Sequence, residues 1–129
     1  MESARWREFA ERALREIGAK AEGATVVFVS DRAVRDLNRR FRGRDKATDV
    51  LSFPTERAAF EKPEEVNLGD VVVSVERAAA QAAEHGLEFD AEVAQLILHG
   101  LLHLCGYDHE TDKGEMNRLE LRLRRRLGI

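Results

Sequence analysis

Apolar side chains recur every three to four residues along five stretches of the chain, and this spacing predicts five helices. The fourth stretch is apolar nearly all round, which is typical of a buried helix rather than a surface one. Glycines and small polar residues stand where helices would end or begin. The predicted helices cover residues 2–21, 31–41, 75–85, 90–105 and the segment after Thr111.

The sequence also predicts which side chains of the second helix are buried and which residues end or cap the helices. Within the second helix, Val34, Leu37 and Phe41 share one face, and we expect all three to be buried. The first helix is expected to end at Gly23, because glycine readily leaves the helical conformation. Side chains able to cap the later helices are Ser30 or Asp31, Ser74, Asp90 and Thr111.

Three short runs rich in β-branched residues predict strands at residues 24–30, 49–53 and 68–74, and we expect the first of them to be buried. The order strand, helix, strand over the first two suggests a parallel pair joined by a right-handed crossover. Residues 55–67 are polar and predict a surface loop. The whole pattern predicts an α+β fold over residues 1–129 as one domain. Its small mixed sheet, of about three to four strands, would pack with helices around one buried central helix.

The composition fits a soluble globular protein of the cytoplasm. The chain has 129 residues, 43% hydrophobic and 35% charged, which is enough for one core. Its longest apolar run is too short to cross a bilayer, and its start lacks a signal-peptide core. One cysteine cannot form an internal disulfide. We therefore expect no membrane association.

Charge is distributed unevenly along the chain. Residues 1–48 carry a net charge of +4, residues 49–110 carry −10 and residues 111–129 carry +3. Basic ends permit contact with a phosphate backbone, although the total of −3 does not argue for nucleic acid. The arginines of the last helix fit a solvated surface and an RNA-backbone contact equally well.

The segment HGLLHLCGYDH, residues 99–109, holds three of the four histidines and predicts a metal centre. His99 and His103 are four residues apart, so on a helix both imidazoles face the same side. Gly106 allows the chain to leave the helix and fold back, which would bring His109 to the same ion. Three nitrogen ligands leave a fourth tetrahedral position for water, as in catalytic zinc sites.

Neighbouring residues limit this interpretation. The spacing is that of the long metzincin motif, but Gly100 stands where those proteases carry a glutamate base, which argues against peptide hydrolysis. Cys105 points away from the histidine face and fits a small buried side chain better than a ligand. His85 lies at a predicted helix end, where a protonated imidazole suits the dipole, and is not counted as a ligand.

Five cations, Arg39, Arg40, Arg42, Arg44 and Lys46, occur within eight positions where the second predicted helix gives way to a loop. Cations at a helix end are favoured by the helix dipole, which accounts for the first two. The others lie in a glycine-containing loop before a strand, where an arginine is placed to meet an anion entering a cleft.

Two motifs resemble the YbeY family, whose members are metal-dependent endoribonucleases linked to ribosomal RNA maturation. One is HGLLHLCGYDH. The other is FRGRDKATDVLSFP at residues 41–54, and the strand GDVVVS at residues 69–74 also agrees. The similarity runs from about residue 30 to residue 112. Ala47 stands where many relatives have proline, so the arginine loop could be less rigid. We also expect the chain to lack the family's extra N-terminal strand, so that its sheet would be one strand smaller or its edge arranged differently.

The resemblance implies a zinc-dependent, single-strand-specific endoribonuclease that matures the 3′ end of small-subunit ribosomal RNA. One Zn2+ per chain would be bound by His99, His103 and His109, and Arg42 would stabilise charge on the phosphate. Arg44 and Lys46 would help to bind RNA, with the ribosomal small subunit as a possible partner. Asp108 could orient a ligand from the second shell or simply form a turn. The alternatives are a metallohydrolase of another class, such as a protease, and a non-catalytic ribosome-associated factor with a structural metal.

Overall fold

The computed structural model describes residues 3–21, 23–55, 67–108 and 111–129, which form five helices and one three-stranded sheet. The described elements, in chain order, are α1 (Ser3–Ile17), β1 (Gly23–Val29), α2 (Asp31–Arg42), β2 (Val50–Pro54), β3 (Asn67–Ser74), α3 (Val75–His85), α4 (Phe89–Leu104) and α5 (Glu115–Leu127). This α+β arrangement confirms the predicted fold class. The predicted loop at residues 55–67 lies almost wholly outside the described residues.

The sheet has the order β1-β3-β2, with β3 parallel to β1 and antiparallel to β2. The expected parallel pair of the first two strands is therefore wrong, because β3 lies between them. Residues 71–74 of β3 are all buried, whereas most of β1 is only partly covered. The central strand is β3, whose residues 71–74 are covered on both faces. The strand β1 lies at the edge of the sheet and is not the buried strand that was predicted.

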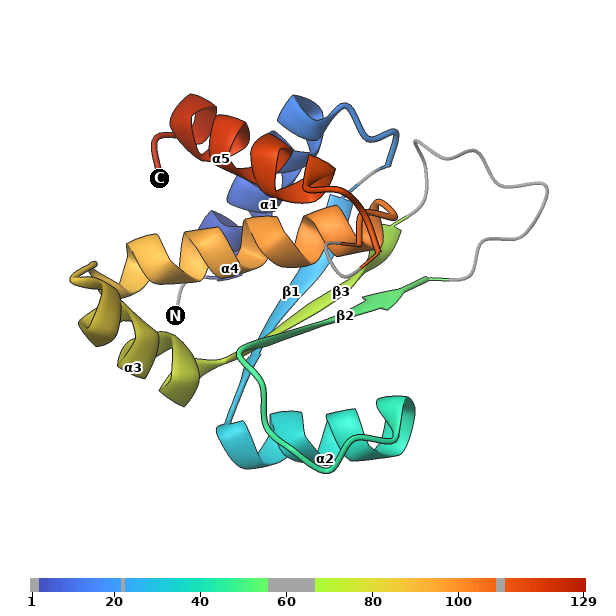
Figure 1. Cartoon of the computed structure of the whole chain (residues 1–129), viewed down its shortest axis with the longest axis vertical. Helices are drawn as coiled ribbons and strands as arrows, with labels where there is room; N and C mark the ends of the chain where they lie inside the picture. Colours follow the sequence, from blue (N-terminus) through green and yellow to red (C-terminus); the bar gives the residue numbers. More distant parts are fainter. Residues whose placement is uncertain (1–2, 22, 56–66, 109–110) are drawn as a thin grey trace.

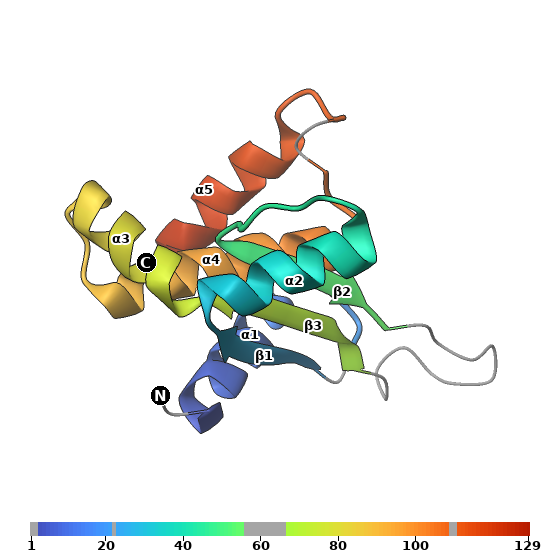
Figure 2. The ribbon, with the colours of Figure 1, turned by 90° about the horizontal axis from the view of Figure 1, so that it is seen from below.

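Helices cover both faces of the sheet, with α1, α4 and α5 on one side and α2 on the other (Figures 1 and 2). The central helix α4 lies against the sheet and contributes the largest fully buried side chains, Ile97, Leu98, Leu101 and Leu102. This confirms the prediction of one buried helix. A second, smaller apolar cluster of Val34, Leu51 and Val72 fills the space under α2. Within the described residues, no helix is long and apolar enough to cross a membrane.

Several predicted helix ends are confirmed. The Ser30 hydroxyl accepts a hydrogen bond from the Ala33 N–H at 3.1 Å, and the Ser74 hydroxyl accepts one from the Arg77 N–H at 3.3 Å. Gly86 ends α3 in the left-handed conformation, with φ of 67°. These local signals were sufficient because the capping atoms belong to the same short segment.

Other ends differ from the prediction. The helix α1 ends before Gly18, which has φ of 87°, and not at Gly23, which begins β1. Asp90 lies in the first turn of α4, where it pairs with an arginine of α1 instead of capping. The last helix follows Gly114. The N–H groups of Gly114 and Met116 donate to the carboxylate of Asp112, so Asp112 and not Thr111 accepts the hydrogen bonds at the start of the helix.

Phe41 is also placed differently from the prediction. Val34 is fully buried, and Phe41 lies two turns later on the same side of α2, yet its side chain is 68% exposed. Its aromatic neighbour is Phe53 in β2, with ring centroids 5.7 Å apart. Periodicity identifies the side of a helix, but it does not reveal how far the covering sheet extends.

Candidate metal centre and adjoining cavity

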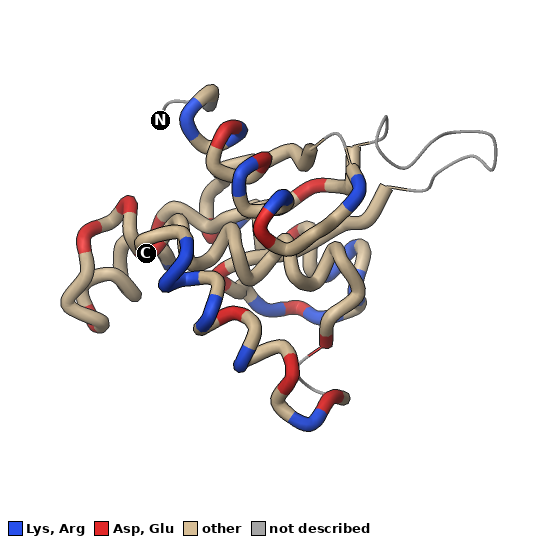
Figure 3. Tube along the Cα trace, turned by 90° about the horizontal axis from the view of Figure 1, so that it is seen from above, with Lys and Arg blue, Asp and Glu red and all other residues tan. Residues whose placement is uncertain are grey.

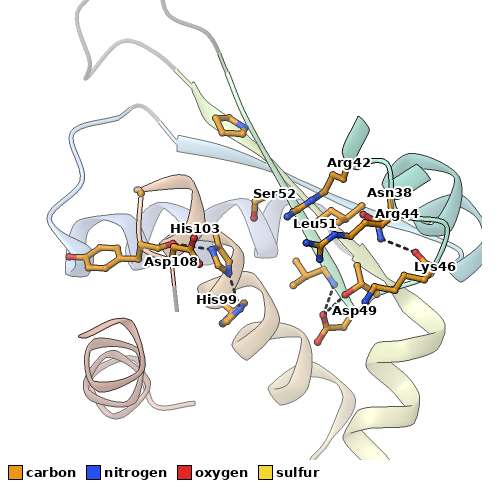
Figure 4. A pocket seen from close by; sticks show the side chains of 15 residues that line it. Asn38, Arg42, Arg44, Lys46, Asp49, Leu51, Ser52, His99, His103 and Asp108 are labelled. Carbon is orange, nitrogen blue, oxygen red and sulfur yellow. Dashed lines mark hydrogen bonds between the residues drawn. The ribbon is translucent and has the colours of Figure 1, made fainter. Parts of the chain in front are cut away.

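His99 and His103 meet on one face of α4, as their spacing predicted. Their Nε2 atoms are 3.1 Å apart, and the ring centroids are 4.7 Å apart with nearly perpendicular planes. Both side chains are half-buried. Figure 4 shows the two rings at one wall of a cavity, projecting from the last two turns of the helix.

The other nitrogen of each ring has an acceptor beside it. The Nδ1 of His99 lies 2.9 Å from Oε1 of Glu120, and the Nδ1 of His103 lies 3.0 Å from the backbone oxygen of Tyr107. A carboxylate or carbonyl accepts only from a protonated nitrogen, so each Nδ1 carries hydrogen. The Nε2 lone pairs then face one another, which is repulsive unless a cation or proton lies between them. This is the way metal-binding histidines are oriented in proteins.

These residues fit a zinc ion. Two nitrogens each about 2.0–2.1 Å from a tetrahedral ion lie roughly 3.3 Å from each other, close to the observed separation of the Nε2 atoms. Gly106 has φ of 97°, so the chain turns after the helix as predicted. His109, the predicted third ligand, lies outside the described residues. Within the described residues, no three His, Cys, Asp or Glu side chains gather in a metal-binding cluster.

The sequence interpretation missed Glu120, which comes from α5 and is 6% exposed. Its Oε2 also lies 3.4 Å from Nη2 of Arg124, so both carboxylate oxygens are engaged. A signal was present in the sequence. Glu120 interrupts the apolar stripe of Met116, Leu123 and Leu127, and a carboxylate facing a core needs a partner there.

Gly100 explains why the protease glutamate has no counterpart here. A Cβ at this position would lie 2.7 Å from Cγ1 of Val71 and 3.1 Å from Oγ of Ser52. The Ser52 hydroxyl also donates to the Gly100 carbonyl at 2.8 Å. The helix α4 therefore approaches the sheet so closely that only glycine fits between the two histidines.

A cavity of about 570 Å3 joins the histidines to the predicted cation loop. His99 and His103 line one side, and Arg42, Arg44 and Lys46 line the other. Figure 4 shows these cations extending from the end of α2 and the following loop, with β2 between them and the histidines. The cation loop and the histidine helix, more than fifty residues apart in the sequence, thus line the same cavity.

Asn38 holds the cation loop in place. Its side chain is 3% exposed, and its Nδ2 donates to the Lys46 carbonyl at 2.9 Å. Gly43 turns the chain with φ of 69°, and the Arg44 N–H donates to the Asn38 carbonyl at 3.2 Å. Sequence analysis did not single out Asn38, although an amide on the buried face of a helix is a sign of a specific partner.

The cations around this loop fall into two groups. Arg35 pairs with Asp45 at 2.8 Å, which lowers the pKa of that carboxyl through a hydrogen bond and the nearby positive charge. Both Arg39 and Arg40 pair with Asp36. By contrast, no ion pair in the described part of the chain involves the three cations that line the cavity, Arg42, Arg44 and Lys46. Among the described residues, these three cations thus face the cavity without an ion pair, and Asp49 and Asp108 line the same cavity.

Asp108 and Cys105, which flank the histidine motif's turn, are placed as follows from their hydrogen bonds and burial. Asp108 lines the cavity, and its backbone oxygen accepts hydrogen bonds from the N–H groups of Thr111 and Asp112, so the predicted turn is observed. That its carboxylate orients a metal ligand stays a prediction. Cys105 is half-buried, and burial raises the pKa of its thiol, which disfavours a thiolate ligand.

Arginines of α5 and the histidine outside the motif, His85, take part in ion pairs. Figure 3 shows basic residues recurring along α5 toward the C-terminus. Two of them are paired, Arg124 with Glu120 and Arg126 with Glu16. His85 pairs with the buried Glu92 at 3.0 Å, and both line a second cavity together with His99 and Glu120.

Known proteins resemble this chain over nearly its full length. The family described as Endoribonuclease YbeY matches residues 1–128. A protein of that name from Solibacter usitatus (strain Ellin6076) is 45% identical over 121 residues, covering 94% of this chain and 76% of that protein. Another from Koribacter versatilis (strain Ellin345) is 47% identical over 121 residues, covering 94% and 74%. The solution structure of TM1509 from Thermotoga maritima has a TM-score of 0.59 and 31% identity, covering 93% and 77%.

Proposed function

The chain belongs to the YbeY endoribonuclease family, and on this premise we propose that it is a zinc-dependent endoribonuclease that cleaves single-stranded RNA. We propose further that its substrate is the 3′ end of small-subunit ribosomal RNA, processed during ribosome biogenesis in the cytoplasm. One observation carries the proposal. Two imidazoles, each with Nδ1 held by an acceptor, face three cations across a single cavity, and those cations have no ion pair within the described residues.

The division of charge in the cavity suits a phosphodiester. Arg42 and Arg44 can each donate two parallel hydrogen bonds to phosphate oxygens, and Lys46 adds a compact positive charge. Held by Asn38 and Gly43, the loop presents these groups before the substrate arrives, so that little reorganisation is needed as charge develops. Arg42 in particular would stabilise the phosphate as the bond to the leaving oxygen breaks.

His99, His103 and His109 would hold the zinc ion, which when bound supplies a Lewis acid and lowers the pKa of a coordinated water to about 7. Glu120 and the Tyr107 carbonyl keep both described ligands in the Nδ1-protonated tautomer, with Nε2 directed at the cavity. The chain's own contribution is thus to fix the ligand rings and to hold the phosphate opposite them.

The packing of Gly100 opposes the protease alternative, because the position of the protease base has no room for a side chain. A protease would also leave Arg42, Arg44 and Lys46 without a role. Against a purely structural metal, the cations share one cavity with the histidines, and a structural site needs no anion-binding wall beside it.

The proposal is tested by incubating zinc-loaded protein with single-stranded RNA, with the same sequence as a duplex, and with casein. We expect cleavage of the single strand, little cleavage of the duplex and none of casein. His103→Ala should remove both the zinc and the cleavage. RNA cleavage by the His103→Ala protein at the wild-type rate, or casein turnover by the wild type, would overturn the proposal.

A further inference from the structure

Phe41 is the most exposed of the large hydrophobic side chains in the described residues, at 68%, against 46% for Leu121 and 37% for Val27. Single exposed apolar residues are ordinary on protein surfaces. This one differs in its surroundings, because it lies in the last turn of α2 between Arg40 and Arg42.

The Phe41 ring is held in place and lies beside the proposed catalytic cavity. Phe53 contacts it edge to face, with ring centroids 5.7 Å apart and planes inclined by 71°. Phe53 belongs to β2 and packs with the apolar cluster under α2, so the two rings lie on the α2 side of this strand. Ser52 and Pro54, on either side of Phe53, point the other way and line the cavity. Arg42, the next residue after Phe41, lines the cavity as well. The ring is thus a fixed apolar surface outside the cavity, one residue away from its cation wall.

An RNA strand offers the combination of groups that this surface would bind. Its phosphates are attracted to Arg42, Arg44 and Lys46, and each nucleotide carries a flat aromatic base within a few ångströms of its phosphate. Unpaired bases stack on aromatic side chains next to cationic grooves in many single-strand-binding proteins, and the contact tolerates any sequence. In a duplex, both faces of every internal base are already covered by neighbouring base pairs.

We propose that Phe41 is a stacking platform for one unpaired base of the RNA, next to the phosphate held by Arg42. The inference rests on the proposed function, and it adds a physical reason why a single strand would be preferred over a duplex. The site takes any nucleobase, since stacking uses the face of the base and not its hydrogen-bonding edge. Phe41 acts in binding, and the metal-bound histidines are unaffected by its removal.

Two variants test the stacking role, and a third serves as control. Phe41→Ala removes the ring, while Phe41→Trp keeps an aromatic face and adds a fluorophore. The existing Trp6 is 3% exposed and buried in the core, so it changes little on binding. Leu121→Ala removes the next most exposed large apolar side chain of the described residues, on α5, which lies on the other side of the sheet from α2 (Figure 1).

Single-turnover cleavage over a range of protein concentrations separates RNA binding from the chemical step. For Phe41→Ala we expect the half-saturating concentration to rise about 5- to 100-fold, the range expected for one stacked base, with the maximal rate unchanged. Leu121→Ala should match the wild type, and Phe41→Trp should retain binding. Fluorescence of the Phe41→Trp protein should be quenched by single-stranded RNA, but much less by duplex RNA or inorganic phosphate.

The outcomes separate this inference from the proposed function. If the wild type cleaves RNA while Phe41→Ala binds and cleaves equally well, stacking is wrong and the nuclease proposal stands. If the wild type cleaves no RNA but the fluorescence of Phe41→Trp is quenched by single-stranded RNA alone, the stacking role is supported and the nuclease proposal is contradicted. Equal quenching by single strand and duplex would overturn the platform. Thermal unfolding of Phe41→Ala near the wild-type midpoint confirms that the fold is intact.

Discussion

The carboxylate of Glu120 on α5 holds Nδ1 of His99 on α4 at 2.9 Å, and this single contact ties two helices to the proposed metal centre. The contact is nearly closed to solvent, since Glu120 is 6% exposed. Arg124, one turn later on α5, lies 3.4 Å from the second carboxylate oxygen. The last helix therefore fixes the orientation of a proposed ligand that it does not itself provide.

Glu120→Gln should weaken zinc binding while leaving the fold intact. The amide is similar in size but is a poorer acceptor, so His99 loses the group that fixes its tautomer and raises its basicity. Loss of such a partner typically reduces metal affinity about 10- to 100-fold. Competition with a chromophoric chelator measures the affinity directly. Glu16→Gln, which breaks the exposed pair with Arg126, should bind zinc as the wild type does; equal affinity in both variants would remove Glu120 from the centre.

Helix spacing predicted much of this fold because the signals were local. The i, i+4 placement of His99 and His103, the caps at Ser30 and Ser74, and the buried character of α4 all follow from residues within one element. Strand order did not follow, because it depends on which strand gains most by being covered on both sides. The partners of His99 and of the cation loop, Glu120 and Asn38, were missed for a related reason. Each looked like one polar residue on a helix until its long-range contact was known.

Arg42→Ala should impair RNA cleavage and leave zinc binding unchanged. Arg42 lines the cavity and has no ion pair among the described residues, so its loss removes charge that the phosphate would meet. We expect a loss of roughly 100-fold or more in the rate, comparable to removal of one preorganised donor in other enzymes. Arg39→Ala is the matched control. It lies one turn earlier on α2 but pairs with Asp36 at 2.7 Å, and it should cleave at nearly the wild-type rate.

Gly100→Ala should destabilise the protein, although alanine favours helix. Helix propensity alone would stabilise this variant by roughly 1 kcal/mol. The added methyl group would lie 2.7 Å from Cγ1 of Val71 and so forces α4 away from the sheet, which typically costs about 1–3 kcal/mol. Denaturant unfolding should show a net loss. A double-mutant cycle with Val71→Ala should recover part of it, and additive losses would show that the clash is not the cause.

Zinc removal should lower thermal stability, and the size of the effect should depend on metal concentration. A ligand that binds only the folded state stabilises it by about 2.7 kcal/mol at 100 times its dissociation constant. A chelator should therefore lower the unfolding midpoint of the wild type, and added zinc should restore it. His103→Ala should unfold at the same temperature with and without chelator. A wild-type midpoint that does not respond to either treatment would argue against a metal centre.

Stability should depend on pH through the pair formed by His85 and Glu92. The Glu92 carboxylate, 3% exposed, accepts a hydrogen bond from Nδ1 of His85 at 3.0 Å and, with its charge, raises the pKa of this histidine above its usual value. A raised pKa in the folded state means that the protonated form is favoured by folding. The contribution is complete below the unfolded pKa of about 6.5 and is lost as pH rises through the higher folded value. Compared with His85→Gln, the wild type should thus gain stability at pH 5.5 that it lacks at pH 9. Unfolding measured at several pH values checks the sign, and a difference that grows with rising pH would contradict the assignment.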